Sequence, residues 1–166
     1  MAVSREREET LKVQTAPVWR MSVELPFAPV DSIIRRNADG LRVSAEATEE
    51  LTRRIQLRGA KLAVEAAERA ESDGRKTLMA ADFEVNTIPE KDALELPIAP
   101  VDRIARLDID DRYRVAMDAR IALASILEDE ADDVAAAAAL LAEHAGRRTV
   151  KAEDVETYFE LHQYVE

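Results

Sequence analysis

Apolar residues recur every three or four positions in two long stretches of the chain, which is the spacing of one face of an α-helix. The first face runs from Ala47 to Ala66 and the second from Ala119 to Ala138. Each stretch predicts a helix of about 27 residues, which is roughly 40 Å long at 1.5 Å per residue. The expected core residues are Ala47, Leu51, Ile55, Leu62 and Ala66 in the first helix, and Ala119, Leu123, Leu127, Val134 and Ala138 in the second.

Residues with strong local preferences mark the ends of both long helices. Ser44 is expected to cap the first helix, because its hydroxyl can accept a hydrogen bond from the first turn. Ala116 stands at the equivalent position of the second helix, which costs about 1 kcal/mol unless Asp118 caps the helix instead. Gly74 and Gly146 follow the two helices and are expected to stop them.

Shorter helices are predicted on either side of each long one. The short helix before the first long helix covers about residues 29–37, and the one before the second long helix covers about residues 100–107. Both begin on a proline, which suits a first helical turn. A short third helix is expected from about Ala80 and from about Lys151. The chain therefore consists of two units, each in the order short helix, long helix, short helix.

The two units repeat one sequence pattern. The segment Leu25–Asp31 recurs as Leu96–Asp102, 71 residues later, and Gly74–Thr77 recurs as Gly146–Thr149, 72 residues later. One residue inserted near Ile109–Tyr113 accounts for the change in spacing. Chance motifs would not keep a common spacing over such a length, so we infer an internal duplication.

The duplication divides the chain into four parts. Residues 1–23 match neither unit and are expected to form a disordered tail; residues 24–87 are unit one, 88–95 the linker and 96–166 unit two. Two short helices cannot cover both sides of a long one, so each unit needs a partner. Because fusion supplies that partner at high effective concentration, we predict that the units pair within the chain.

Composition supports an all-α fold without catalytic chemistry. Aromatic residues make up only 4% of the chain, and alanine, leucine, glutamate and arginine dominate, which favours helix over strand. There is no cysteine, no glycine-rich phosphate loop and no metal-ligand spacing, so we expect no enzyme activity, metal, cofactor or small-molecule substrate. No apolar stretch is long enough to span a membrane and residues 1–20 are too polar for a signal peptide, so a cytoplasmic protein is expected.

The net charge of −11 argues at first against DNA as a partner, since phosphate binding needs cations. However, the chain has five lysines and 18 arginines, a bias similar to that of proteins from salt-accumulating halophiles. In molar salt the Debye length is about 3 Å, so local geometry outweighs total charge. The charge is also unequal, because residues 24–84 carry −2 and residues 95–166 carry −9. The acidic run at residues 128–133 is expected to be a solvated face.

Several of these motifs resemble the archaeal histone family. Leu96–Pro100 matches the family's Leu-Pro-Ile-Ala-Pro opening, and Arg42–Ser44 matches its Arg-Val-Ser loop. His144–Asp154 matches its closing His-Ala-Gly-Arg-Lys-Thr and Lys-Ala-Glu-Asp segments. The resemblance covers about residues 24–162. It implies that the chain is a tandem (doublet) histone of a halophilic archaeon. In such a chain two histone folds would pair as an intramolecular handshake dimer.

This resemblance implies that duplex DNA is held by paired loops and by the N-termini of the first helices, through shape rather than base sequence. Arg42 and Arg114 would enter the minor groove. Ser32 stands where unit two has Arg103, which removes one contact. The remaining implied contacts are Lys76, Thr77, Arg148 and Thr149 in the second loops, and Arg35, Arg103 and Arg106 in the first helices.

Four other residues near the second loops have an implied structural role. Arg75 with Asp82, and Arg147 with Asp154, correspond to the family's internal ion pair between loop and third helix. An arginine held in this way cannot also grip DNA well. We therefore place these pairs outside the DNA-binding set.

Residues implied in contacts between chains are present in one unit only. Leu141 and His144 stand where neighbouring histone dimers form a four-helix contact, whereas unit one has Arg69 and Ser72 at the equivalent positions. We expect two copies of the chain to meet through unit two, and assembly to stop there.

The expected function is that of a histone-like protein, associated with the chromosome, that bends or wraps double-stranded DNA with little sequence preference. It would act in chromatin organisation, in transcription regulation, or in both. The alternative is a histone-fold interaction module in transcription regulation with little direct DNA wrapping. The acidic surface favours the alternative and the loop cations oppose it.

Overall fold

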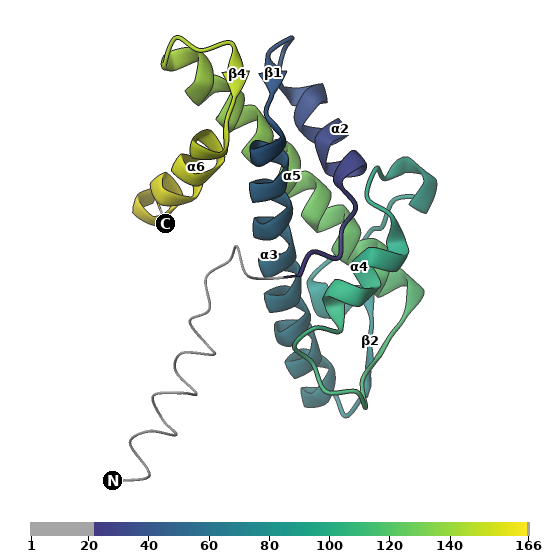
Figure 1. The fold of residues 1–166 in the computed structure, drawn as a ribbon. Coiled ribbons are helices and arrows are strands. Elements are labelled where there is room, and N and C mark those ends of the chain that lie inside the picture. Colours follow the sequence, from purple (N-terminus) through teal and green to yellow (C-terminus); the bar gives the residue numbers. More distant parts are fainter. Residues whose placement is uncertain (1–21, 166) are drawn as a thin grey trace, which may run out of the picture.

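The computed structural model describes residues 22–165, so the tail expected at the N-terminus lies almost wholly outside the described residues (Figure 1). Unit one follows the predicted order of elements. Its elements are helix α2 (Phe27–Asn37), strand β1 (Arg42–Val43), helix α3 (Ala45–Ser72), strand β2 (Thr77–Leu78) and the 3-10 helix η2 (Ala80–Phe83).

Unit two repeats this order after a linker that contains one 3-10 turn, η3 (Lys91–Ala93). The elements of unit two are helix α4 (Ile98–Ala105), strand β3 (Arg114–Val115), helix α5 (Met117–His144), strand β4 (Thr149–Val150) and helix α6 (Ala152–Val165). The prediction of an all-α fold with two long helices is therefore confirmed. The four strands are two-residue segments of the loops.

The two units pair with each other through their loops and long helices. Helices α3 and α5 pack against each other, and α2 also packs on α5 (Figure 1). Strand β1 pairs in parallel with β4, and β2 pairs in parallel with β3. Each pairing thus joins the first loop of one unit to the second loop of the other. This reciprocal arrangement confirms the predicted handshake within one chain.

The core lies where the apolar faces of α3 and α5 meet the first helices. All the predicted core positions are buried except Leu62, which is partly buried. Val30, Ile33 and Ile104 from the first helices are fully enclosed against them. Full burial of one such side chain contributes about 1.5–3 kcal/mol. Each unit supplies one long helix and one first helix to this common core.

The predicted helix boundaries are confirmed in part. Ser44 caps α3 by accepting a hydrogen bond from the Ala47 amide at 3.1 Å, and Gly74 and Gly146 follow α3 and α5 with positive φ angles of 73° and 72°. Helix α5 has no side-chain cap. Asp118, the expected substitute cap, does not bind the first turn of α5. Its carboxylate accepts a hydrogen bond from the Ala80 amide of unit one instead.

The third helices differ more than the sequence repeat suggests. Helix α6 has 14 residues, whereas η2 has four and is followed by Glu84, whose φ is +61°. The residues after Glu84 are Val-Asn-Thr-Ile-Pro. This segment is rich in β-branched side chains and leads into a proline, which disfavours helix. Unit two has no proline after α6 begins, so its helix continues.

The acidic run at residues 128–133 is only partly the solvated face that was expected. Asp132 forms two hydrogen bonds with the Arg36 guanidinium, at 2.9 and 2.8 Å, and one with the Asn37 amide at 2.7 Å. Glu130 pairs with Arg58 at 3.2 Å. Burial alone would raise the pKa of Asp132, but the hydrogen bonds from Arg36 and Asn37 lower it. Part of the excess negative charge of unit two therefore binds cations of unit one.

Equivalent residues on the two long helices bind the backbone just before each first helix. Gln56 on α3 accepts the Glu24 amide at 2.8 Å, and its own amide donates to the Ser22 carbonyl at 2.6 Å. At the equivalent position of α5, Glu128 accepts the amides of Glu95 and Leu96 at 2.6 and 3.0 Å. These contacts fix the start of both first helices, which begin two residues before the predicted prolines.

Candidate nucleic-acid interface

The β1–β4 pairing places the predicted contacts of two loops side by side. The Arg42 amide donates to the Arg148 carbonyl at 2.9 Å, and Arg42 lies opposite Thr149 in the register. The side chains of Arg42 and Arg148 are exposed. Neither guanidinium forms an ion pair within residues 22–165. This edge therefore offers two exposed cations, 106 positions apart in sequence, to an anion.

The β2–β3 pairing repeats this geometry with the other two loops. The Arg114 amide donates to the Lys76 carbonyl at 2.8 Å, and Arg114 lies opposite Thr77. Arg114 is exposed and has no ionic partner in the described chain. Lys76 differs from its counterpart Arg148, because its ammonium lies 3.3 Å from the Glu71 carboxylate. The six loop residues predicted for DNA binding are thus assembled as two groups of three.

Both implied internal ion pairs are present. Arg75 forms hydrogen bonds of 2.9 and 2.7 Å with the two oxygens of Asp82, and Arg147 binds both oxygens of Asp154 in the same way. Each arginine also donates to a strand carbonyl, that of Thr77 or Thr149. The pairs therefore hold each second loop against the start of the following helix.

The carboxylates of these pairs are almost fully buried, with 3% of Asp82 and of Asp154 exposed. The hydrogen bonds from Arg75 lower the pKa of Asp82 in spite of its burial. Burial would raise the pKa of Asp154, but hydrogen bonds from Arg147 and from the Lys151 amide outweigh it, and the pKa is lowered. Both groups stay ionised and keep the loops in place.

The predicted first-helix contacts are exposed but already hold carboxylates. Arg35 pairs with Asp31 at 2.7 Å, and Arg106 pairs with Asp102 at 3.1 Å, each one helical turn back. Arg103 pairs with Glu24 of the other unit at 3.1 Å. No side chain caps α2 or α4, so their first-turn amides have no side-chain acceptor.

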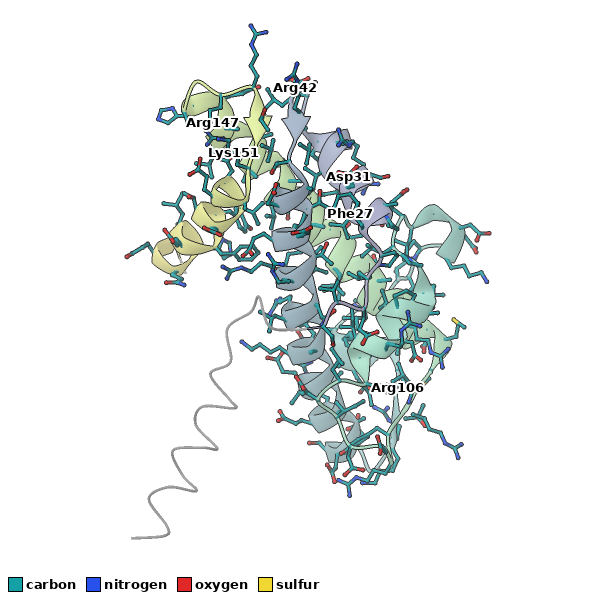
Figure 2. The ribbon with its side chains drawn as sticks, in the orientation of Figure 1. Phe27, Asp31, Arg42, Arg106, Arg147 and Lys151 are labelled. Atoms are coloured by element: carbon teal, nitrogen blue, oxygen red, sulfur yellow. The ribbon has the colours of Figure 1, made fainter. Side chains whose placement is uncertain are left out.

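Figure 2 shows how these groups are distributed: Arg42, Arg147 and Lys151 gather where β1 meets β4, whereas Arg106 lies toward the other end of the molecule. Lys151 was not among the predicted contacts. It is exposed, directly follows β4 and forms no ion pair within the described residues. Its position three residues after the predicted contact Arg148, in the Lys-Ala-Glu-Asp segment, could have indicated that it lies at the same edge.

Three further residues at the β2–β3 edge were not predicted. Arg112 and Tyr113 precede β3, and both contact Glu71 at the end of α3. Arg112 also lies over the Tyr113 ring, with 5.2 Å between its guanidinium carbon and the ring centre. The inserted residue near Ile109–Tyr113 was the available signal, since it makes this loop unlike its counterpart in unit one.

The residues expected in contacts between chains lie at the end of α5. Leu141 is partly buried and His144 is exposed. Leu140, the neighbour of Leu141 on α5, has 67% of its surface exposed, and Leu161 on α6 has 52% exposed. In unit one, Arg69 binds the Asp82 carbonyl at 2.7 Å and pairs with Glu84 at 3.4 Å. The two ends of the molecule are therefore different in shape and chemistry.

Within residues 22–165, no helix is both long and apolar enough to cross a membrane. The same residues contain no group of three or more histidine or acidic side chains arranged to hold a metal ion.

Two units of three helical elements, paired through reciprocal loops with exposed arginines on the paired edges, define a histone-fold protein. The sequence profile of the family described as "Histone-like transcription factor (CBF/NF-Y) and archaeal histone" matches residues 23–85 and 94–157. The two matches together span more than half of the chain, and the chain belongs to this family.

Known proteins agree with this assignment. The chain is 54% identical over 61 residues to one of the subunits of the archaeal histone HAN1 of Thermococcus zilligii, a match that covers 37% of this chain and 88% of that protein. The crystal structure of the histone from Methanopyrus kandleri aligns with a TM-score of 0.60 and 25% identity, covering 80% of this chain and 91% of that one. The crystal structure of a protein from Thermus thermophilus aligns with a TM-score of 0.60 and 17% identity over 86% of this chain and 99% of that one, which supports the fold alone.

Proposed function

We propose that this protein binds double-stranded DNA as a histone-like protein and bends or wraps it along the two loop edges. Arg42 and Arg114 enter the minor groove, and the second-loop residues hold the adjacent phosphates. Contacts of this kind read the width and flexibility of the duplex, so sequence preference is weak. The protein acts at the chromosome, in its organisation, in transcription regulation, or in both.

The observation that carries this proposal is the pairing of Arg42 with Arg148 on one edge, and of Arg114 with Lys76 on the other. An isolated loop arginine is usually only solvated. Here each edge collects cations from two loops far apart in sequence, and Arg42, Arg114 and Arg148 have no carboxylate partner in the described chain. A phosphate would therefore meet these cations without breaking an ion pair.

The acidic surface is compatible with this proposal if the protein works in concentrated salt. The arginine bias and the charge of −11 favour the salt-rich interior of a halophile. Screening over about 3 Å in molar salt hides the distant carboxylates from DNA. Close contacts at the loops persist, because they are shorter than the screening length.

The proposal is tested by the affinity of duplex DNA for the variant Arg42→Ala/Arg114→Ala, measured by fluorescence anisotropy across a range of KCl concentrations. Loss of two close cation contacts should weaken binding at least about tenfold and make it less sensitive to salt. The matched control is Arg58→Ala/Lys61→Ala, which removes two exposed cations from the middle of α3, outside the loops. Equal weakening in both variants would show that total charge, and not the loops, determines the affinity.

A second candidate is a protein-interaction module in transcription regulation. The charge of −9 over residues 95–166 favours it, because this surface repels phosphate and attracts basic partners. The same measurement separates the two functions. Failure of the native chain to bind DNA at any KCl concentration would leave the interaction module as the better account.

We also propose that two chains associate through the end of unit two, with Leu141 and His144 at the contact. The exposure of Leu140, which adjoins Leu141 on α5, supports this proposal, since apolar side chains exposed next to one another mark interaction sites. At the other end, unit one has only the four residues of η2 beside α3, which cannot supply a second helix to a four-helix contact. Assembly therefore stops at two chains.

A further inference from the structure

The carboxylate of Glu71, at the end of α3, binds three groups of the β2–β3 edge at once. The Tyr113 hydroxyl donates to Oε2 at 2.6 Å. The Lys76 ammonium lies 3.3 Å, and the Arg112 guanidinium 3.4 Å, from Oε1. Lys76 belongs to unit one, whereas Arg112 and Tyr113 belong to unit two. One carboxylate thus binds a cation from each unit at this edge.

Tyr113 holds Glu71 in this position. Its ring is buried, with 6% of the residue exposed, so the hydroxyl has a fixed place from which to donate. Both cations lie over the same ring, with Lys76 5.5 Å and Arg112 5.2 Å from its centre. The hydrogen bond from Tyr113, followed by that from Lys76, lowers the pKa of Glu71. The carboxylate therefore remains ionised at neutral pH and competes with any other anion at this edge.

The β1–β4 edge has the equivalent glutamate without these contacts. Glu143 stands 72 residues after Glu71 and is exposed, but its carboxylate forms no ion pair or hydrogen bond within residues 22–165. Gly40 and Leu41 occupy the positions of Arg112 and Tyr113. Without a phenol to position it, Glu143 leaves Arg148 free. The two edges differ mainly in whether a carboxylate already holds the second-loop cation.

We propose that Glu71 is an internal competitor for DNA phosphate, which occupies Lys76 and Arg112 and so makes the β2–β3 edge the weaker of two DNA contacts. This inference rests on the proposed DNA binding of the loops. A phosphate reaching this edge must displace Glu71 or bind beside its negative charge, whereas at the β1–β4 edge it meets Arg42 and Arg148 directly. The fused chain therefore binds DNA mainly through the β1–β4 edge, and Glu71 causes this difference between the two edges.

The test compares Glu71→Gln with Glu143→Gln in the full chain. Both substitutions remove one negative charge at the same repeat position, and the amide oxygen of the glutamine introduced beside Tyr113 can still accept its hydroxyl. Duplex affinity is measured by fluorescence anisotropy from low to molar KCl, with helix content checked by circular dichroism. Glu71→Gln should tighten binding about fivefold at the lower salt concentrations and raise the apparent number of released ions by about one or two. Glu143→Gln should change either quantity much less.

A second comparison shows whether the gain comes from the released cations. In the background Lys76→Ala/Arg112→Ala, adding Glu71→Gln should no longer tighten binding. Equal tightening by Glu71→Gln and Glu143→Gln, or a gain that survives in that background, overturns the inference while DNA binding stands. Absence of DNA binding by the native chain overturns the proposed function itself, and the inference with it.

Discussion

At the scale of single residues, the loop arginines have two distinct roles. Arg75 and Arg147 point into the protein and bind the buried carboxylates of Asp82 and Asp154. Arg42 and Arg148 are exposed and hold no carboxylate in the described part of the chain. Neighbouring arginines of one loop thus differ: one holds the loop in place, and the other is available for the proposed DNA contact. Substitutions should therefore affect either stability or DNA binding, depending on which group they remove.

The internal pair makes a prediction about stability and pH. Asp82→Asn should lower the free energy of unfolding by about 2 kcal/mol at pH 7, because hydrogen bonds between charged groups are lost beside a buried position. The pKa of Asp82 is lower in the folded chain than its value of about 3.9 in an unfolded one. Its contribution is therefore complete above that value and is lost as the pH falls through the folded pKa.

Urea unfolding of the native chain and Asp82→Asn between pH 7 and pH 3 measures this effect. The difference between the two should be constant near neutrality and shrink below about pH 4. The control is Asp73→Asn, which removes a second carboxylate from Arg75 at a position 69% exposed and should cost little. A difference between native chain and Asp82→Asn that grows toward low pH would contradict this role.

At this scale the sequence indicates some contacts of the predicted site residues and not others. Arg35 and Arg106 were expected to be DNA contacts, but each lies four residues after an aspartate and pairs with it. That spacing is itself a known stabilising pattern on a helix, so the pairs could have been foreseen. The contact of Glu71 with Tyr113 could not, because it joins residues 42 apart that meet only when the units cross.

At the scale of elements, the two third helices give the molecule unequal ends. Helix α6 packs on both long helices, and Arg54 of α3 lies 4.9 Å from the centre of the Phe159 ring. The 3-10 helix η2 packs on the same two helices, but with only four residues. Both long helices and their stops could be predicted from apolar spacing and glycine. The length of α6 could not, because the repeat implied that both third helices were short.

Because only the end with α6 can supply two helices to a contact, we predict that the protein forms a dimer of chains and no larger assembly. Light scattering, with and without a short duplex, should give the mass of two chains for the native protein. Leu141→Ala/His144→Ala should give one chain, because the apolar contact at the end of α5 is lost. The control is Arg69→Ala/Ser72→Ala, the equivalent positions of unit one, which should still give two. Open-ended growth with concentration, or a single native chain throughout, would contradict the proposal.

At the scale of the whole molecule, fusion lets two copies of one pattern diverge. Separate identical subunits would present two equal loop edges and two equal ends. In this chain one edge has Arg42 and Arg148 free, whereas the other has Lys76 bound to Glu71. The charge of unit two is balanced in part by Arg36 and Arg58 of unit one. Such cross-unit contacts explain why the charge of either unit alone is a poor guide to what the pair can bind.

The central claim is that the paired loops hold and shape duplex DNA, and nuclease digestion of long DNA at molar KCl tests it most directly. The native chain should protect discrete fragments of recurring length, and Arg58→Ala/Lys61→Ala should protect the same fragments. Arg42→Ala/Arg114→Ala should lose this protection, because the minor-groove contacts are removed from both edges. Undiminished protection by that variant, or no protection by the native chain at any KCl concentration, would contradict the account.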